Sequence, residues 1–261
     1  MTTNSQLQFQ QPILRRSISS QVLRNLVVAA QAVILWRLSV IGLWPVALVF
    51  LLLVELRFNL THLRRSAFVH HTPQLLAGVA AVLSITAYPR AIPQAGAGIL
   101  YLFWRIWLEQ YTKRADDRNL LTTLLGQAFI FEAIFLTAAL LDMPKIITLL
   151  LVWAAAFAGA YHLLTQRQER TAGVLAAAWA LIALEVSWVT MNWLVSYTVL
   201  NGYLIVPQPA IILTVLAYCF GSIYLAQRQN QLGRKRLTEY LIIGLCIILV
   251  VIAGTTWKGS I

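Results

Sequence analysis

The chain alternates between long apolar runs and short polar segments, most of them basic. Nine stretches are long enough, or nearly so, for the 17–25 residues of a membrane-spanning helix, and they are 22–36, 40–56, 73–88, 96–112, 119–141, 145–164, 171–206, 209–227 and 237–256. The pattern predicts an all-α polytopic integral membrane helix bundle with about nine transmembrane helices, or eight as the alternative. We expect one transmembrane domain over 22–257, a disordered cytoplasmic tail over 1–21 and a short tail over 258–261.

Two regions of this pattern are ambiguous. Residues 22–56 form either two short spans with a turn at Arg37–Ser39, or an interfacial helix followed by one span. The stretch 171–206 is too long for one upright helix and barely long enough for two. We expect 190–206 to be a tilted helix extension or a re-entrant segment, with Asn201-Gly202 as the natural break.

Composition and charge support a membrane location. Hydrophobic residues make up 59% of the chain and charged residues 11%, against about 25% charged residues in soluble domains. The net charge of +11 is interpreted as positive-inside topology. A nucleic-acid partner is disfavoured, because no basic domain with interleaved aromatic residues lies outside the apolar runs.

The basic residues also predict an orientation. With a cytoplasmic N-terminus and nine spans, sixteen of the 20 basic residues fall on the inner side. The four left outside are Arg37, Arg90, Lys145 and Lys258. An extra span at 190–206 would move the cluster 228–236 outside, which argues against it. We therefore predict a multi-pass protein of the cell (plasma) membrane with its C-terminus outside.

Two segments of the chain, 118–168 and 170–229, share a similar sequence pattern that predicts a helical hairpin in each. Each copy has a basic start, an apolar run with one glutamate, a turn with proline and a second apolar run. The matching phrases are Pro144-Lys-Ile-Ile147 with Pro209-Ala-Ile-Ile212, and Gln166-Arg-Gln168 with Gln227-Arg-Gln229. The duplication is a hypothesis, because aligning both ends needs a shift of about one helical turn.

The two glutamates are the sharpest functional signals in the sequence. Glu132 follows Arg118 by 14 residues, and Glu185 follows Arg170 by 15. At 1.5 Å per residue, each lies roughly 20 Å into the membrane. A central carboxylate costs at least about 2.5 kcal/mol to insert, so we expect both to face the bundle interior.

Polar and aromatic residues continue the helical face of Glu185. Trp188, Asn192 and Ser196 follow it at i+3, i+7 and i+11, on one face of a continuous helix. Together with Glu132, they are the candidate lining of a polar cavity. The alternative is a hydrogen-bonded cluster that only holds helices together.

Several classes of site find no support in the sequence. Cys219 and Cys246 form no CxxC pair, and no metal or cofactor site is expected. His62, His70 and His71 share one inner connector, where an interfacial role is favoured over a metal site. A lipid-modifying enzyme is the weakest hypothesis, because paired acids are missing and no catalytic motif occurs.

The stretch Glu185-Val-Ser-Trp188 before a proline-led span resembles uncharacterised multi-span membrane families of reduced-genome bacteria. This resemblance covers mainly 118–228 and implies a multi-span fold without a known activity. Two functions stay open. The protein handles an unidentified small molecule or ion through a cavity near Glu185, or it is a non-catalytic scaffold or accessory subunit in contact with other membrane subunits. In both, the lipid bilayer is the first partner.

Overall fold

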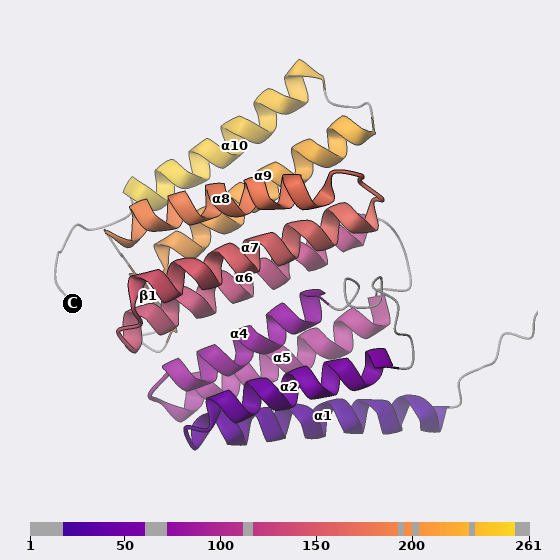
Figure 1. The fold of residues 1–261 in the computed structure, drawn as a ribbon. Coiled ribbons are helices and arrows are strands. Elements are labelled where there is room, and N and C mark those ends of the chain that lie inside the picture. Colours follow the sequence, from indigo (N-terminus) through magenta and orange to yellow (C-terminus); the bar gives the residue numbers. More distant parts are fainter. Residues whose placement is uncertain are drawn as a thin grey trace, which may run out of the picture.

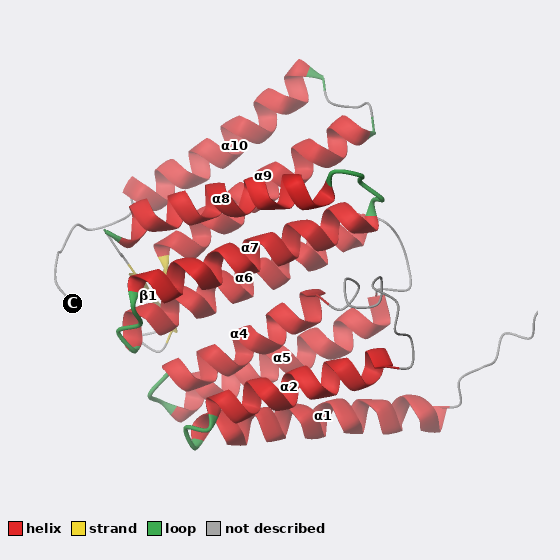
Figure 2. Ribbon diagram, in the orientation of Figure 1, coloured by secondary structure: helices red, strands yellow, loops and turns green. Residues whose placement is uncertain are grey.

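The structure is a computed structural model, which describes residues 18–60, 72–111, 117–192, 196–199, 204–229 and 233–253. Over these residues the chain forms helices that lie side by side, with one short β-hairpin at an end of the bundle (Figures 1 and 2). The helices are α1 (Ile18–Val40), α2 (Trp44–Leu60), α4 (Thr72–Ala87), α5 (Ala91–Tyr111), α6 (Asp117–Leu140), α7 (Lys145–Gln166), α8 (Ala172–Met191), α9 (Gln208–Arg228) and α10 (Arg234–Ala253). The strands are β1 (Ser196–Val199) and β2 (Leu204–Pro207).

Four helices are long and apolar enough to cross a membrane within the described part of the chain. They are Leu120–Leu140 of α6 together with α7, α8 and α9. Shorter apolar helices lie at Asn25–Val40, Trp44–Glu55 and Thr72–Ala87. The all-α prediction is therefore confirmed, with four helices that could span a membrane by length and composition, while the count of nine spans stays a prediction.

Proline marks the beginnings of three helices as the sequence indicates. Helix α4 begins at Thr72 with Pro73 in its first turn, and α7 begins directly after Pro144. Helix α9 carries Pro209 in its first two positions. Proline suits these positions because its missing N–H would have no partner in the first turn.

The first helix differs from its predicted limits. Helix α1 already begins at Ile18, inside the predicted tail, and it continues through Arg37–Ser39 to Val40. The turn comes later, where Gly42 has φ +82°, a conformation that glycine adopts without steric cost. Residues 22–56 thus form two helices, and residues 1–17 of the predicted tail lie outside the described residues.

The prediction of a tilted helix extension at 190–206 is wrong, because α8 ends at Met191 and the described residues between Asn192 and α9 form two strands. The alternative of a re-entrant segment stays a prediction. Strands β1 and β2 pair antiparallel, with Ser196 opposite Pro207 and Val199 opposite Leu204. The strands are rich in β-branched and aromatic residues, which favour extended pairing over helix. The predicted break at Asn201-Gly202 lies outside the described residues.

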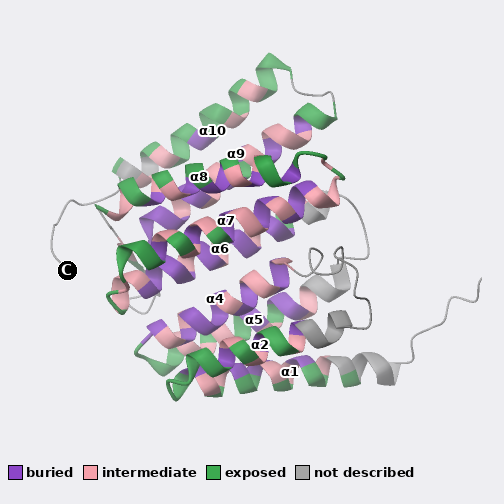
Figure 3. Cartoon of the chain, viewed as in Figure 1, coloured by how far each residue is buried: buried purple, intermediate pink, exposed green. Residues whose placement is uncertain are grey.

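The main core lies between α4, α6, α7, α8 and α9, where buried positions cover the facing surfaces (Figure 3). Large side chains from α6, including Phe131 and Phe135, are fully buried there. Small residues on α7, among them Ala155, Ala156, Gly159 and Ala160, are buried and allow close helix packing. A Cβ added at Gly159 would lie 2.3 Å from Nε2 of Gln127 on α6. The Gln127 side chain therefore packs directly against the backbone of α7 at Gly159.

Candidate functional site

A cavity of about 290 Å³ lies between α4, α5 and α6. Its wall is built from small residues, including Ala77, Ala80 and Ala81 of α4 and Gly96 and Ala97 of α5. Because these side chains are short, the helices leave space between them that larger residues would fill. The volume is close to the lower limit of small-molecule sites.

Aromatic residues form much of the remaining wall. Tyr101 and Trp104 of α5 and Phe129 of α6 line the cavity. The Trp104 ring meets the Phe129 ring edge to face, with 5.6 Å between centroids. Tyr101 and Trp104 are themselves buried, so their rings are shielded from the outside at this end of the cavity.

Glu132 of α6 supplies the charge in this apolar cavity. It lies 15 residues after the start of α6 and eight before its end at Leu140, which is about 22 Å and 12 Å along the axis. It makes no hydrogen bond or ion pair with any residue that the structure describes, and nothing in the described chain neutralises its charge. The predicted interior position of Glu132 is therefore correct.

Tyr88 connects the cavity to the β-hairpin. Its hydroxyl donates to the Ile205 carbonyl at 3.4 Å, and the Ile205 amide N–H donates back to the Tyr88 hydroxyl at 3.3 Å. Tyr88 also lines the cavity, as does Ser84. The Tyr88 side chain thus connects the cavity wall to strand β2. On the other side of the hairpin, the Tyr197 hydroxyl donates to the Val251 carbonyl of α10.

Two residues of the cavity wall are also exposed on the outside of the molecule. Ile92 and Leu100 of α5 line the cavity and are exposed by 70% and 46%. The cavity is therefore not fully enclosed by the described chain.

A buried ion pair lies next to the cavity. Arg105 follows Trp104 on α5, and its Nη1 is 2.6 Å from Oε1 of Glu55 on α2. Their side chains are only 5% and 3% exposed. The spacing of Arg105, Glu109 and Lys113 at i, i+4 and i+8 predicts a solvated charge ladder on one helical face, and for Arg105 that prediction is wrong. The missed signal is its place inside α5, six residues before the end of that helix at Tyr111.

The residues predicted around Glu185 do not form a cavity. Glu185, Trp188 and Asn192 do share one face of α8, but all three are exposed. Trp188 is 60% exposed, and the Asn192 amide donates only to the Trp188 carbonyl, at 3.2 Å. Ser196 belongs to strand β1, because α8 ends at Met191. The sequence spacing correctly predicted that Glu185, Trp188 and Asn192 share one face of the helix, but this face points outward and not into the bundle.

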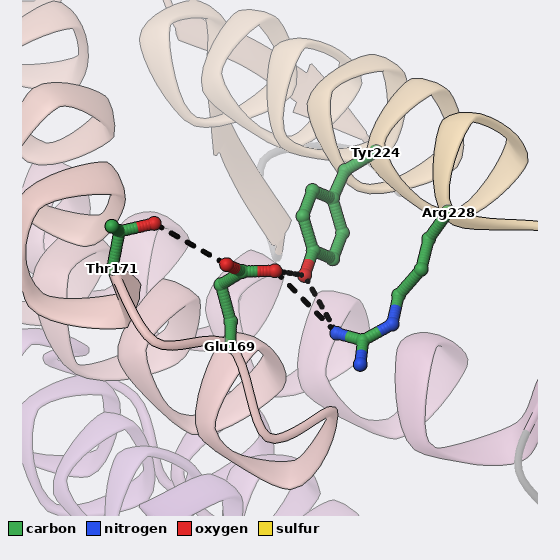
Figure 4. A network of polar contacts seen from close by, with 4 residues as sticks. All are labelled: Glu169, Thr171, Tyr224 and Arg228. Carbon is green, nitrogen blue, oxygen red and sulfur yellow. Dashed lines mark hydrogen bonds and ion pairs between the residues drawn. The ribbon is translucent and has the colours of Figure 1, made fainter.

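A polar network lies at the opposite end of the bundle, around the turn between α7 and α8. Tyr224 of α9 donates its hydroxyl hydrogen bond to Glu169 at 2.7 Å, and Arg228 Nη1 lies 3.5 Å from the same carboxylate oxygen (Figure 4). Thr171 donates to the other oxygen at 3.3 Å. The Tyr224 hydrogen bond is the main cause that lowers the pKa of Glu169. The network joins two helices and encloses no cavity.

Metal ligation finds no support in the described residues. No group of three His, Cys, Asp or Glu side chains comes together in them. His162 is buried and forms a 2.9 Å hydrogen bond with Gln166. His62, His70 and His71 lie outside the described residues, so the structure does not bear on their predicted role.

Comparison with known proteins adds no relative. No protein-family model matches the chain, no curated protein is similar to it, and no solved structure has a similar fold. The cavity beside Glu132 is thus the candidate site on geometric and chemical grounds alone.

Proposed function

We propose that the protein is a multi-pass membrane protein that binds a small hydrophobic cation in the cavity between α4, α5 and α6. The observation that carries this proposal is the Glu132 carboxylate, which opens into an apolar cavity without a partner among the described residues. A carboxylate at this depth is costly. A bound cation would offset that cost by pairing with it.

The aromatic wall narrows the chemical class. Tyr101, Trp104 and Phe129 surround a space beside a negative charge. Aromatic faces attract ammonium groups, most strongly where water is excluded. The combination favours an organic amine or quaternary ammonium group carried on an apolar body, over a small inorganic ion that needs several oxygen ligands.

Binding of benzyltrimethylammonium to the protein in lipid nanodiscs tests this proposal. Its neutral isostere, neopentylbenzene, has the same shape without the charge. The wild-type protein should prefer the cation, and Glu132→Gln should weaken cation binding by about tenfold or more. Binding of neopentylbenzene should change little. Ala97→Phe should fill the cavity and weaken both.

Glu185→Gln is the matched control, because it removes the other membrane glutamate without touching the cavity. Equal affinities for the two ligands, or equal losses in Glu132→Gln and Glu185→Gln, would contradict a binding role for Glu132. We therefore propose a ligand cavity near Glu132 in place of the cavity near Glu185 that the sequence suggested, because Glu185 is exposed and Glu132 lines a cavity.

A non-catalytic scaffold or accessory subunit is the second candidate function. It is favoured by the outward position of Glu185, Trp188 and Asn192, since polar groups on the surface of a membrane helix are typical of helix–helix contacts. In both functions we propose the nine-span arrangement, with the N-terminus in the cytoplasm and the C-terminus outside.

A further inference from the structure

Helix α8 presents an exposed stripe with a regular spacing. The exposed residues Val174, Ala178, Leu181, Glu185, Trp188 and Asn192 follow one another at intervals of four, three, four, three and four, and Gly173, Ile182 and Val189 beside them are exposed too. These intervals keep the six residues on one face of the helix, along which a second helix can pack. The opposite face of α8, with Ala176 and Ala180, is already buried in the core.

A glutamate on that stripe is anomalous for a lipid-facing surface. Glu185 lies 13 residues from the start of α8 and six from its end, about 20 Å and 9 Å along the axis. Helical side chains lean toward the N-terminus of their helix. The Glu185 side chain therefore points along the helix axis toward the N-terminus of α8, away from the nearer, C-terminal end. The described chain gives it no partner.

The chemistry of the stripe is self-complementary. A two-fold axis along the membrane normal places each seam position opposite the same position of a second copy. Asn192 can then both donate to and accept from its counterpart. At Glu185, a carboxylic acid on one copy can donate its O–H to the carboxylate of the other. Ala178 allows the helices to approach closely near one end.

We propose that this stripe of α8 is the interface of a symmetric homodimer, in which two α8 helices run parallel and the two Glu185 side chains meet. The contact removes both carboxyl groups from lipid and gives each a hydrogen-bond partner. It leaves the cavity beside Glu132 untouched, because that cavity lies between α4, α5 and α6.

Cysteine cross-linking of the full chain in membranes tests the geometry. In a background with Cys219→Ala and Cys246→Ala, Leu181→Cys should form a disulfide-linked dimer under mild oxidation. Ile182→Cys is the matched control, since it is equally apolar, similarly exposed at 48% against 55%, and turned about 100° around the helix. It should not cross-link. Equal cross-linking at both positions, or a Leu181→Cys product with a different protein, would overturn the proposal.

Energy transfer between labelled copies during lipid dilution tests the role of Glu185. Glu185→Leu should weaken self-association by about tenfold, whereas Glu185→Gln, which keeps a self-complementary amide, should retain most of it. Val33→Leu on the exposed face of α1 serves as a control and should leave association unchanged. A wild-type protein that stays monomeric in lipid, or a Glu185→Leu variant that associates as well as wild type, would refute the interface.

Discussion

At the residue scale, three glutamates of this protein lie in three different environments. Glu132 faces an apolar cavity, Glu185 lies on the outer surface of a helix, and Glu169 pairs with Tyr224 at a bundle end. We therefore propose a different role for each carboxyl group: ligand pairing for Glu132, self-association for Glu185 and fixation of a turn for Glu169. Residue type and depth alone do not separate these roles, so the direction of each side chain decides among them.

The Glu169 network gives a pH-dependent prediction. Its pKa is lowered, chiefly by the Tyr224 hydroxyl. Its stabilising contribution is therefore present above the ordinary carboxyl pKa of about 4.3 and is lost as the pH falls through the lowered value in the folded state. Tyr224→Phe should raise the pKa of Glu169 toward its ordinary value, measured by a carbon-13 NMR titration of labelled glutamate. Because the pKa in the folded state then lies closer to the pKa in the unfolded state, the variant's acid-dependent loss of stability should be smaller and complete at a higher pH.

Thr171→Val provides the comparison for that titration, because Thr171 contributes less than Tyr224 to the lowered pKa. The upward shift should be smaller in this variant than in Tyr224→Phe. The reverse order would show that the Tyr224 hydrogen bond is not the main cause.

At the element scale, the Glu55–Arg105 ion pair ties α2 to α5 at the buried side of both helices. Removing one side chain takes the 2.6 Å contact away from the other buried charge. We expect Glu55→Gln and Arg105→Met each to lower the free energy of unfolding by about 3–5 kcal/mol, measured in mixed detergent micelles. The double variant should recover much of that loss, since neither charge of this contact is then buried.

A surface change that removes one positive charge, Arg90→Gln, would control for general effects of altered net charge. Additive losses in the double variant of Glu55 and Arg105 would contradict direct coupling between the two side chains.

Element boundaries show what the sequence can and cannot reveal. Thr72, Pro144 and Pro209 mark helix starts through local chemistry, so their helices were predictable to within a residue or two. The β-hairpin was not, because its apolar residues also suit a membrane helix and its partners are distant. Tyr88 and Ile205, which bond to each other, are separated by 117 residues.

The candidate site was predictable only in part, because local sequence signals identify single residues but not the contacts between distant helices. Glu132 was identified from its depth in an apolar run, and the structure places it on the cavity as an interior acid. Its cavity arises from small residues of α4 and α5, whose contact with α6 no local pattern encodes. For Glu185, the 3.5-residue spacing was visible in the sequence, but burial on the opposite face of α8 decides that this stripe points outward.

At the scale of the whole molecule, the ends of the helices sort by charge. The α7–α8 turn and the α9–α10 connection lie at one end of the bundle, and the α4–α5 and α6–α7 turns lie at the other (Figure 1). Arg167, Arg170 and the cluster Arg234–Arg236 belong to the first end, whereas Arg90 and Lys145 belong to the second. From the positive-inside rule we expect the first end to face the cytoplasm.

Single cysteines at the two ends test this orientation in intact cells. In the background without Cys219 and Cys246, Arg90→Cys should react with a membrane-impermeant maleimide added outside, because that residue is exposed in the α4–α5 turn. Arg170→Cys, exposed in the α7–α8 turn, should react only after the membrane is permeabilised. The opposite pattern would show that the predicted orientation is reversed. Labelling of both positions from outside would show that the α4–α5 and α7–α8 turns lie on the same side of the membrane, against the predicted number of crossings between them. Since Arg90 and Arg170 are both exposed arginines in short turns, a difference in labelling reports the side of the membrane and not the local access to each turn.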